Sequence, residues 1–122
     1  MFFFRHKTKL ADTGFFRGFV DSHSHILPGV DDGIRTIEES LAVLAYFDSL
    51  GVKKVRLTPH VMNGVEHWED VLQAFDTLRK RYTGETVLEL GAEYMLDSGF
   101  GERLEKGLQP LCGDCVLVET SY

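Results

Sequence analysis

Several features that would direct function elsewhere are missing from this sequence. Its 122 residues can form one domain with a core, but they fall short of the roughly 250 residues of a closed (β/α)8 barrel. The chain contains no apolar run long enough to span a bilayer. A G-x-S-x-G nucleophile elbow and a phosphate-binding P-loop are also absent. These absences exclude serine hydrolases of the elbow type and P-loop nucleotidases.

Cysteine is scarce, and its placement excludes two further chemistries. Cys112 and Cys115 form a single C-x-x-C pair, which cannot complete a four-ligand zinc site. The apolar run 116–118 follows directly, so the pair precedes a strand instead of opening a helix as a thioredoxin-type pair does. Neither cysteine has an arginine six residues later, which excludes the cysteine-based phosphatase loop. We therefore predict two reduced, partly buried thiols.

Positive charge is sparse outside the N-terminal segment. The formal net charge is −6, which argues against nucleic-acid binding and suits a site for metal cations. Residues 1–18 carry four basic side chains, Arg5, Lys7, Lys9 and Arg17, and one acidic side chain, Asp12. We treat residues 1–18 as an N-terminal arm, flexible or packed. A peripheral foot, with Phe2 to Phe4 in a membrane interface, is the less favoured alternative. The start does not resemble a secretory signal, so we expect a cytoplasmic protein.

The remaining sequence alternates strand and helix patterns, which predicts an α/β fold with parallel strands. Thr36 and Glu39 form a capping box that opens a helix, and Gly51 is placed to stop it. A second helix is expected at 68–82, ended by Gly84, and a short one at 100–106. Strands are expected at 18–22, 54–58, 86–90 and 115–120, with Pro59 ending the second.

Histidines and glutamates stand at the ends of these strands. His23 and His25 follow the first strand, His60 the second and Glu93 the third, while Glu119 ends the fourth. A single such residue is more often a solvated loop side chain. In a β/α architecture, however, the carboxyl ends of successive strands converge on one face, where catalytic residues lie. We therefore predict that these side chains form one site.

Five further polar residues are assigned with less support from the pattern. Asp32 is a candidate ligand, although Asp-Asp-Gly is also an ordinary turn sequence. Asp21 either orients the site or caps its strand, and Glu89 is expected on the flank of a strand. His6 and His67 have no comparable placement, and we expect both at the surface.

The charge of this cluster favours bound metal. Asp32, Glu93 and Glu119 together bring a charge of about −3 beside neutral imidazoles, which is unfavourable unless cations neutralise it. Two divalent ions would do so, and mixed imidazole and carboxylate ligands suit Mn²⁺, Fe²⁺ or Zn²⁺.

The motifs also resemble a known family. The string F-V-D-S-H-S-H-I-L-P-G-V-D-D-G at 19–33, E-E-S at 38–40, L-T-P-H at 57–60 and N-G at 63–64 resemble the PHP (polymerase and histidinol phosphatase) superfamily. Within it, the H-S-H-I-L-P-G-x-D-D-G string is similar to bacterial manganese-dependent protein-tyrosine phosphatases of the CpsB/YwqE type. G-A-E at 91–93 and L-V-E-T-S-Y at 117–122 resemble the next two motifs of that family.

The resemblance implies a metal-dependent phosphatase. Carried over, the family's metal ligands fall on His23, His25, Asp32, His60, Glu93 and Glu119. The family holds up to three ions that activate water. It removes phosphate from the phosphotyrosine tail of a cognate bacterial tyrosine kinase, and so regulates capsular and exopolysaccharide synthesis.

The family also sets expectations for the extent of the chain. It continues into a distorted (β/α)7 TIM-like barrel, with a further His, an Asp-x-His pair and phosphate-binding arginines. Residues 19–122 are therefore expected to be its N-terminal half, truncated, weakly active at most and self-associating. Two alternatives stay open: another PHP phosphoesterase, acting on histidinol phosphate or a nucleotide, or a non-catalytic self-associating fragment.

Overall fold

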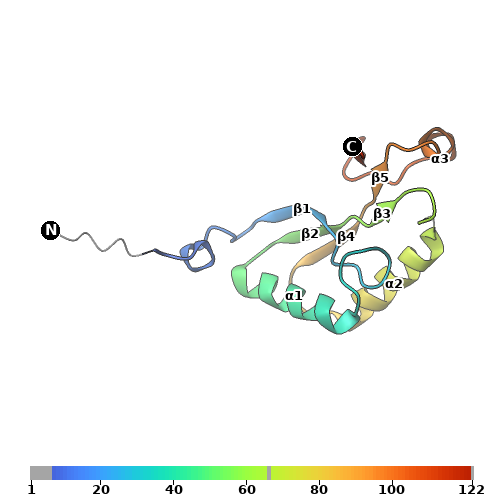
Figure 1. Cartoon of the computed structure of the whole chain (residues 1–122). Helices are drawn as coiled ribbons and strands as arrows, with labels where there is room; N and C mark the ends of the chain where they lie inside the picture. The colour runs from blue at the N-terminus through green and yellow to red at the C-terminus, as the bar shows by residue number, and fades with distance from the viewer. Residues whose placement is uncertain (1–6, 66, 122) are drawn as a thin grey trace.

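The computed structural model describes residues 7–65 and 67–121 and has an α/β fold with parallel strands, as predicted (Figure 1). A short 3-10 helix, η1, lies near the N-terminus. The elements in chain order are η1 (Leu10–Thr13), β1 (Val20–Ser24), α1 (Ile37–Leu50), β2 (Lys54–Leu57), β3 (His60–Val61), α2 (Trp68–Arg81), β4 (Val87–Leu90), β5 (Glu93–Met95), α3 (Phe100–Lys106) and β6 (Leu117–Glu119). Within the described ranges, no helix has both the length and the apolar character needed to cross a bilayer.

The strands form two parallel sheets, ordered β1-β2-β4 and β3-β5-β6. The predicted strands 54–58 and 86–90 correspond to β2 and β4, and each is followed by a short strand that was not predicted, β3 and β5. Pro59 separates β2 from β3 because it has no N–H for the ladder. Its carbonyl nevertheless accepts a hydrogen bond from the Glu93 amide (2.9 Å), and pairing resumes at His60. The prediction that the second strand ends at Pro59 is therefore confirmed for β2.

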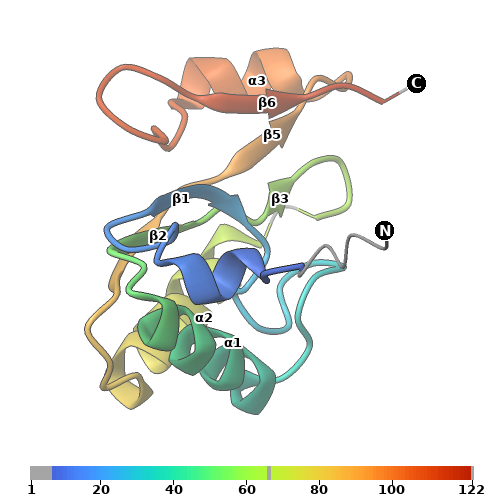
Figure 2. The same cartoon turned by 90° about the vertical axis from the view of Figure 1, so that its left-hand side faces the viewer.

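Helices α1 and α2 cover one face of the β1-β2-β4 sheet (Figures 1 and 2). Apolar side chains from that sheet, both helices and the loop after β1 form the buried core. Its buried members are Ile26, Leu27, Leu44, Val52, Val55, Leu57, Val71 and Leu78. In the described part of the chain, no side chain of β3, β5, β6 or α3 belongs to this cluster.

Helix α1 begins and ends as predicted. The Thr36 hydroxyl accepts a hydrogen bond from the Glu39 amide (3.3 Å), and the Glu39 carboxylate accepts one from the Thr36 amide (3.1 Å), completing the capping box. Gly51 follows the helix with a φ of 78°, a left-handed conformation that favours glycine.

Helix α2 ends at Arg81, within one residue of the predicted end, and Tyr82 is its extended C-cap. Gly84 lies beyond the C-cap, so the prediction that it ends the helix was wrong. A polar cluster follows the helix, in which Asp48 Oδ1 accepts hydrogen bonds from the Tyr82 hydroxyl (2.6 Å) and the Thr86 hydroxyl (2.8 Å). A Cβ at position 84 would meet the Asp48 carboxylate and the Tyr82 hydroxyl, which would have to shift.

Two other predicted strand boundaries also shift. β1 begins at Val20 because Gly18 has a left-handed φ of 73° and forms a turn. β6 begins at Leu117 because Cys112 and Cys115 close a tight turn, in which the Cys115 amide donates to the Cys112 carbonyl (2.9 Å). Both thiols are free and exposed, so the prediction of partly buried thiols was wrong.

Helix α3 is held by polar contacts. Arg103 Nη1 donates to Asp97 (2.6 Å) and Arg103 Nη2 to the Asn63 side chain (2.8 Å). Asp97 also accepts from the Asn63 amide (2.8 Å). The guanidinium of Arg103 is the main cause that lowers the pKa of Asp97 to about 2. These contacts join α3 to the loop after β3.

We expect the Asp48 cluster to stabilise the fold measurably. Asp48→Ala should lower the free energy of unfolding by about 2 kcal/mol at pH 7, because several donors lose a charged acceptor. Asp76→Ala, which removes an exposed ion pair with Lys80, is the matched control and should cost less than about 0.5 kcal/mol. Urea denaturation of both variants measures the difference.

The same cluster should give a pH dependence of known sign. Burial raises the pKa of Asp48, but hydrogen bonds from Tyr82, Thr86 and Glu85 outweigh it and leave the pKa lowered. The stabilisation is therefore complete at pH 7 and is lost as the pH falls below about 4. The stability gap between wild type and Asp48→Ala should shrink over that range; a constant gap would contradict the assignment.

Candidate metal centre

The six residues predicted as a site lie at one edge of the structure. His23 is in β1 and His25 follows that strand. His60 opens β3 and pairs in register with Glu93, which opens β5, while Glu119 closes β6. His60 and Glu93 also follow the carboxyl ends of β2 and β4, and Glu119 lies at that of β6, so the parallel strands bring these side chains together. Asp32 joins them from the loop between β1 and α1.

Three overlapping groups, formed by these six side chains together with Asp31, could each hold a metal ion. Within each group, one donor atom per residue lies within 4.8 Å of the others. The groups are His25, Asp31, Asp32 and His60; His23, His25 and Glu93; and His60, Glu93 and Glu119. Since neighbouring groups share members, the arrangement suits a cluster of ions better than one isolated ion.

Glu93 is the shared centre of the cluster and is only 7% exposed. Its Oε1 lies 3.4 Å from His23 Nε2. Its Oε2 lies 3.2 Å from both His25 Nε2 and His60 Nδ1. A carboxylate with its two oxygens facing different imidazoles has the geometry to bridge two cations.

Three buried atoms of the cluster have no hydrogen-bond partner: His60 Nδ1, Glu93 Oε2 and Glu119 Oε1. They are close together, with His60 Nδ1 only 2.8 Å from Glu119 Oε1, yet without hydrogen-bond geometry. A buried polar atom without a partner costs about 1–3 kcal/mol, so three together need a compensating group. A divalent cation satisfies all three, and the residues present therefore fit a metal.

His23 is oriented by a hydroxyl that the sequence did not suggest. Its Nδ1 lies 2.7 Å from Thr58 Oγ1. When the Thr58 hydroxyl donates its only proton to the Ser24 carbonyl (3.2 Å), it accepts from His23 Nδ1–H. The lone pair of His23 is then on Nε2, the atom that faces Glu93.

His25 is oriented by Asp31, which belongs to the Asp-Asp-Gly turn sequence and was not predicted as a site residue. Asp31 Oδ2 accepts from His25 Nδ1 (2.9 Å) and from the His60 amide (3.1 Å). Since a carboxylate only accepts, the imidazole proton is on Nδ1 and the lone pair of Nε2 is directed at the cluster. Burial raises the pKa of Asp31, but the hydrogen bonds from His25, Gly33 and His60 leave it lowered.

The loop between β1 and α1 is folded to place Asp31 beneath His25. Asp31 Oδ1 accepts from the Gly33 amide (2.9 Å), and the Ile34 amide donates to the His25 carbonyl (3.1 Å). A Cβ on Gly33 would collide with the His25 carbonyl, so glycine is required at this close approach. The buried Ser40 hydroxyl, donating to the Ile26 carbonyl (2.6 Å), fixes the loop to α1.

The secondary candidates have separate positions. Asp21 Oδ1 accepts from the His23 amide (3.1 Å), so its carboxylate supports the backbone of the site. Glu89 pairs with Arg56 (3.0 Å) and Lys54 on the flank of the sheet, as expected. His67 is exposed, as expected, and His6 lies outside the described residues.

Asp32 and Asp31 differ sharply in exposure. The Asp32 side chain is 85% exposed, and its Oδ1 lies 3.3 Å from His60 Nε2, whereas the Asp31 side chain is 2% exposed. Asp32 is therefore on the solvent side of the cluster and Asp31 behind it. A cavity of about 520 Å³ adjoins His60 and is lined in part by Trp68, Tyr94 and Lys106.

Comparisons with known proteins identify the family of the chain. Residues 19–121 match the family described as capsular polysaccharide synthesis, CpsB/CapC. The chain is 36% identical over 102 residues to tyrosine-protein phosphatase CpsB of Streptococcus pneumoniae, covering 78% of this chain and 41% of that protein. It is also 36% identical over 70 residues to tyrosine-protein phosphatase YwqE of Bacillus subtilis (strain 168), covering 56% of this chain and 28% of that protein.

The chain thus spans less than half the length of the curated relatives that it matches. The match nevertheless includes all six strand-end and loop residues of the cluster and most of the chain. The chain belongs to the CpsB/CapC family of capsular polysaccharide synthesis proteins.

Proposed function

We propose that this chain supplies metal ligands to a phosphatase centre that hydrolyses phosphotyrosine in proteins. The observation that carries the proposal is the buried trio His60 Nδ1, Glu93 Oε2 and Glu119 Oε1, which has no hydrogen-bond partner and suits a cation. The names of both curated relatives, tyrosine-protein phosphatases, support the choice of substrate.

The proposed ligands are His23, His25, Asp32, His60, Glu93 and Glu119. Mixed imidazole and carboxylate donors favour Mn²⁺, with Fe²⁺ or Zn²⁺ as alternatives. Divalent ions at such a centre supply positive charge that stabilises phosphoryl oxygens and acidifies water. None of the six proposed ligands is a cysteine or serine, and the proposed nucleophile is water activated by the bound ions.

The protein's own contribution is to fix donor atoms and leave one side open. Thr58 and Asp31 hold the imidazoles of His23 and His25, and the carboxylate of Glu93, which faces both rings, would hold bound metal together with them. The exposed Asp32 lies on the side from which a phosphate group can approach. The cavity beside His60, with aromatic walls and Lys106, has the chemistry to receive a tyrosyl group.

Finer parts of the proposal rest on the family resemblance. We propose that the substrate is the phosphotyrosine tail of a bacterial tyrosine kinase in the cytoplasm, and that its dephosphorylation regulates capsular and exopolysaccharide synthesis. Residues 19–122 would form the N-terminal half of a distorted (β/α)7 TIM-like barrel. Exposed Val20 on β1 and Val118 on β6, at opposite edges of the strand array, support self-association of the chain.

We expect Glu93 to dominate metal binding. Glu93→Gln should weaken binding of Mn²⁺ at least tenfold (an order-of-magnitude estimate), because a neutral amide cannot bridge two cations. Glu89→Gln is the matched control, since it alters a carboxylate on the neighbouring strand that serves an ion pair, and it should change binding less than about twofold. Isothermal titration calorimetry measures both; equal losses would contradict the assignment.

We propose that Asp31 positions His25 without binding metal. Asp31→Asn should weaken Mn²⁺ binding about 10- to 100-fold, because an amide can donate to Nδ1 and reverse the tautomer. Nitrogen NMR of the metal-free protein provides an independent readout. The His25 ring should be protonated at Nδ1 in wild type and lose that preference in the variant, whereas the His23 ring, held by Thr58, should not change.

We expect little phosphatase activity from the 122-residue chain alone. The chain covers 41% of pneumococcal CpsB, and the family resemblance places a further His, an Asp-x-His pair and phosphate-binding arginines in the remainder, so the described ligands would form only part of the centre. With Mn²⁺, hydrolysis of p-nitrophenyl phosphate should be at least about 100-fold slower than that of pneumococcal CpsB measured in parallel. Comparable turnover would show that the described ligands suffice.

A further inference from the structure

We propose that the segment before β1 forms a docking surface for anionic lipid membranes. We call this surface the basic-aromatic arm. It consists of Lys7, Lys9, Leu10, Phe15, Arg17 and Phe19. The proposal does not rest on the proposed phosphatase function, because the family match begins only at Phe19.

Apolar side chains of the arm face solvent. Phe15 is 59% exposed, Leu10 52% and Phe19 41%. The two aromatic rings are held against the body of the protein. The Phe15 and Phe19 rings contact Phe16 at centroid distances of 5.2 and 5.6 Å, and Phe16 packs against the buried core. Rigidly held, exposed aromatic rings are a feature of protein surfaces that insert into the interface of a bilayer.

The charge of the arm selects the partner. Residues 7–18 carry Lys7, Lys9 and Arg17 against Asp12, whereas residues 19–122 carry nine Lys and Arg against eighteen Asp and Glu. Within 7–65 and 67–121, none of the three cations of the arm forms an ion pair. A basic, apolar patch on an otherwise acidic protein complements a negatively charged lipid surface and gives the protein one preferred orientation on it.

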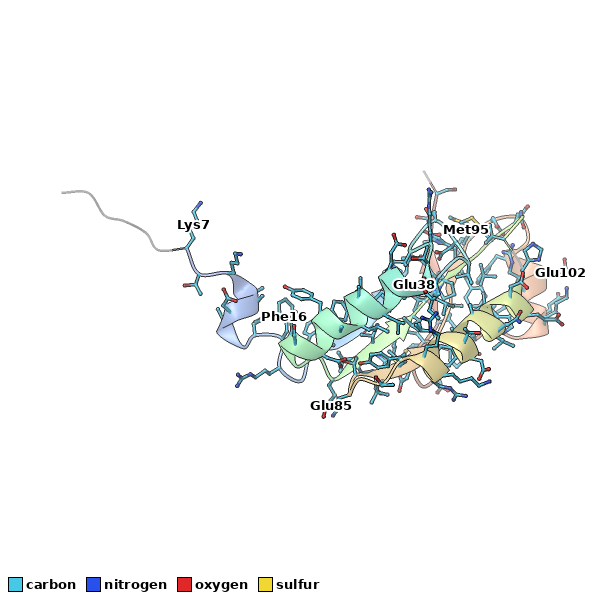
Figure 3. All side chains as sticks on the ribbon, turned by 90° about the horizontal axis from the view of Figure 1, so that it is seen from below. Lys7, Phe16, Glu38, Glu85, Met95 and Glu102 are labelled. Carbon is cyan, nitrogen blue, oxygen red and sulfur yellow. The ribbon has the colours of Figure 1, made fainter. Side chains whose placement is uncertain are left out.

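The arm lies at the end of the molecule opposite to the metal centre. The Gly18 amide donates to the Gly51 carbonyl and the Lys53 amide to the Phe19 carbonyl (both 2.8 Å), at the amino ends of β1 and β2. His23 and His25 lie toward the carboxyl end of β1, roughly 13 Å further at about 3.3 Å per residue. Figure 3 shows Lys7 and Phe16 at one end, with Met95 and Glu102 at the other. Docking through the arm therefore leaves the centre facing away from the membrane.

Vesicle flotation of the 122-residue chain tests the electrostatic part. Binding is expected to vesicles of phosphatidylcholine with about one third phosphatidylglycerol, but not to phosphatidylcholine alone. Lys7→Gln/Lys9→Gln should lower the partition coefficient about 25-fold, since each basic residue contributes about fivefold. Arg79→Gln/Lys80→Gln on α2 makes the same change in net charge and should alter partitioning less than about twofold.

The apolar part is tested with a second pair of variants. Phe15→Ser should lower partitioning at least about fivefold, whereas Leu104→Ser on α3, which removes a side chain of equal exposure (58%), should not. Circular dichroism verifies that all variants fold. Equal binding to both vesicle types, no binding, or equal effects of the arm and control variants would overturn the proposal. A dimer in light scattering that is lost in Phe15→Ser, together with no binding to vesicles, would also overturn the proposal.

Discussion

A carboxylate removed from water is tolerated only where positive charge or hydrogen bonds compensate for it. Glu93 is in that position, with its two oxygens among the imidazoles of His23, His25 and His60. The parallel strands bring these groups together from separate parts of the sequence, and Thr58 and Asp31 fix the direction of two of the rings. The β1–α1 loop, with its required glycine at position 33, exists in this form because Asp31 has to reach His25.

Much of the fold could be predicted because the relevant signals are local. The capping box at Thr36 and Glu39 and the left-handed Gly51 are each read from a few neighbouring residues, and the structure has both. The parallel arrangement followed from the alternation of strands and helices. The convergence of the six site residues followed from it, because each was placed at the carboxyl end of a strand or in the adjoining loop.

The errors come from interactions between residues distant in sequence. The pairing that resumes after Pro59 involves the amide of Glu93, more than thirty residues later, so the short strand β3 could not be read locally. The place of Gly84 beside Asp48, a residue of another helix, could not be read locally either. The role of Asp31 was missed because Asp-Asp-Gly is a common turn sequence. Only the position of the His25 ring distinguishes the carboxylate of Asp31 from that of Asp32. The thiols were expected to be partly buried because the strand was extended back over a turn.

The uneven distribution of the apolar core has a consequence for local stability. Core side chains join β2, β4 and the loop after β1 to α1 and α2, whereas the described side chains of β3, β5, β6 and α3 are not part of this core cluster. The contact of Arg103 with Asp97 lies within that second part. Regions with few buried apolar contacts open at lower free energy than the core. Glu93 and Glu119 are therefore carried by a part of the chain that opens more readily than the core, whereas His25 adjoins the core residues Ile26 and Leu27. An ion bound between them would close that difference, since it joins the two parts only when both are folded.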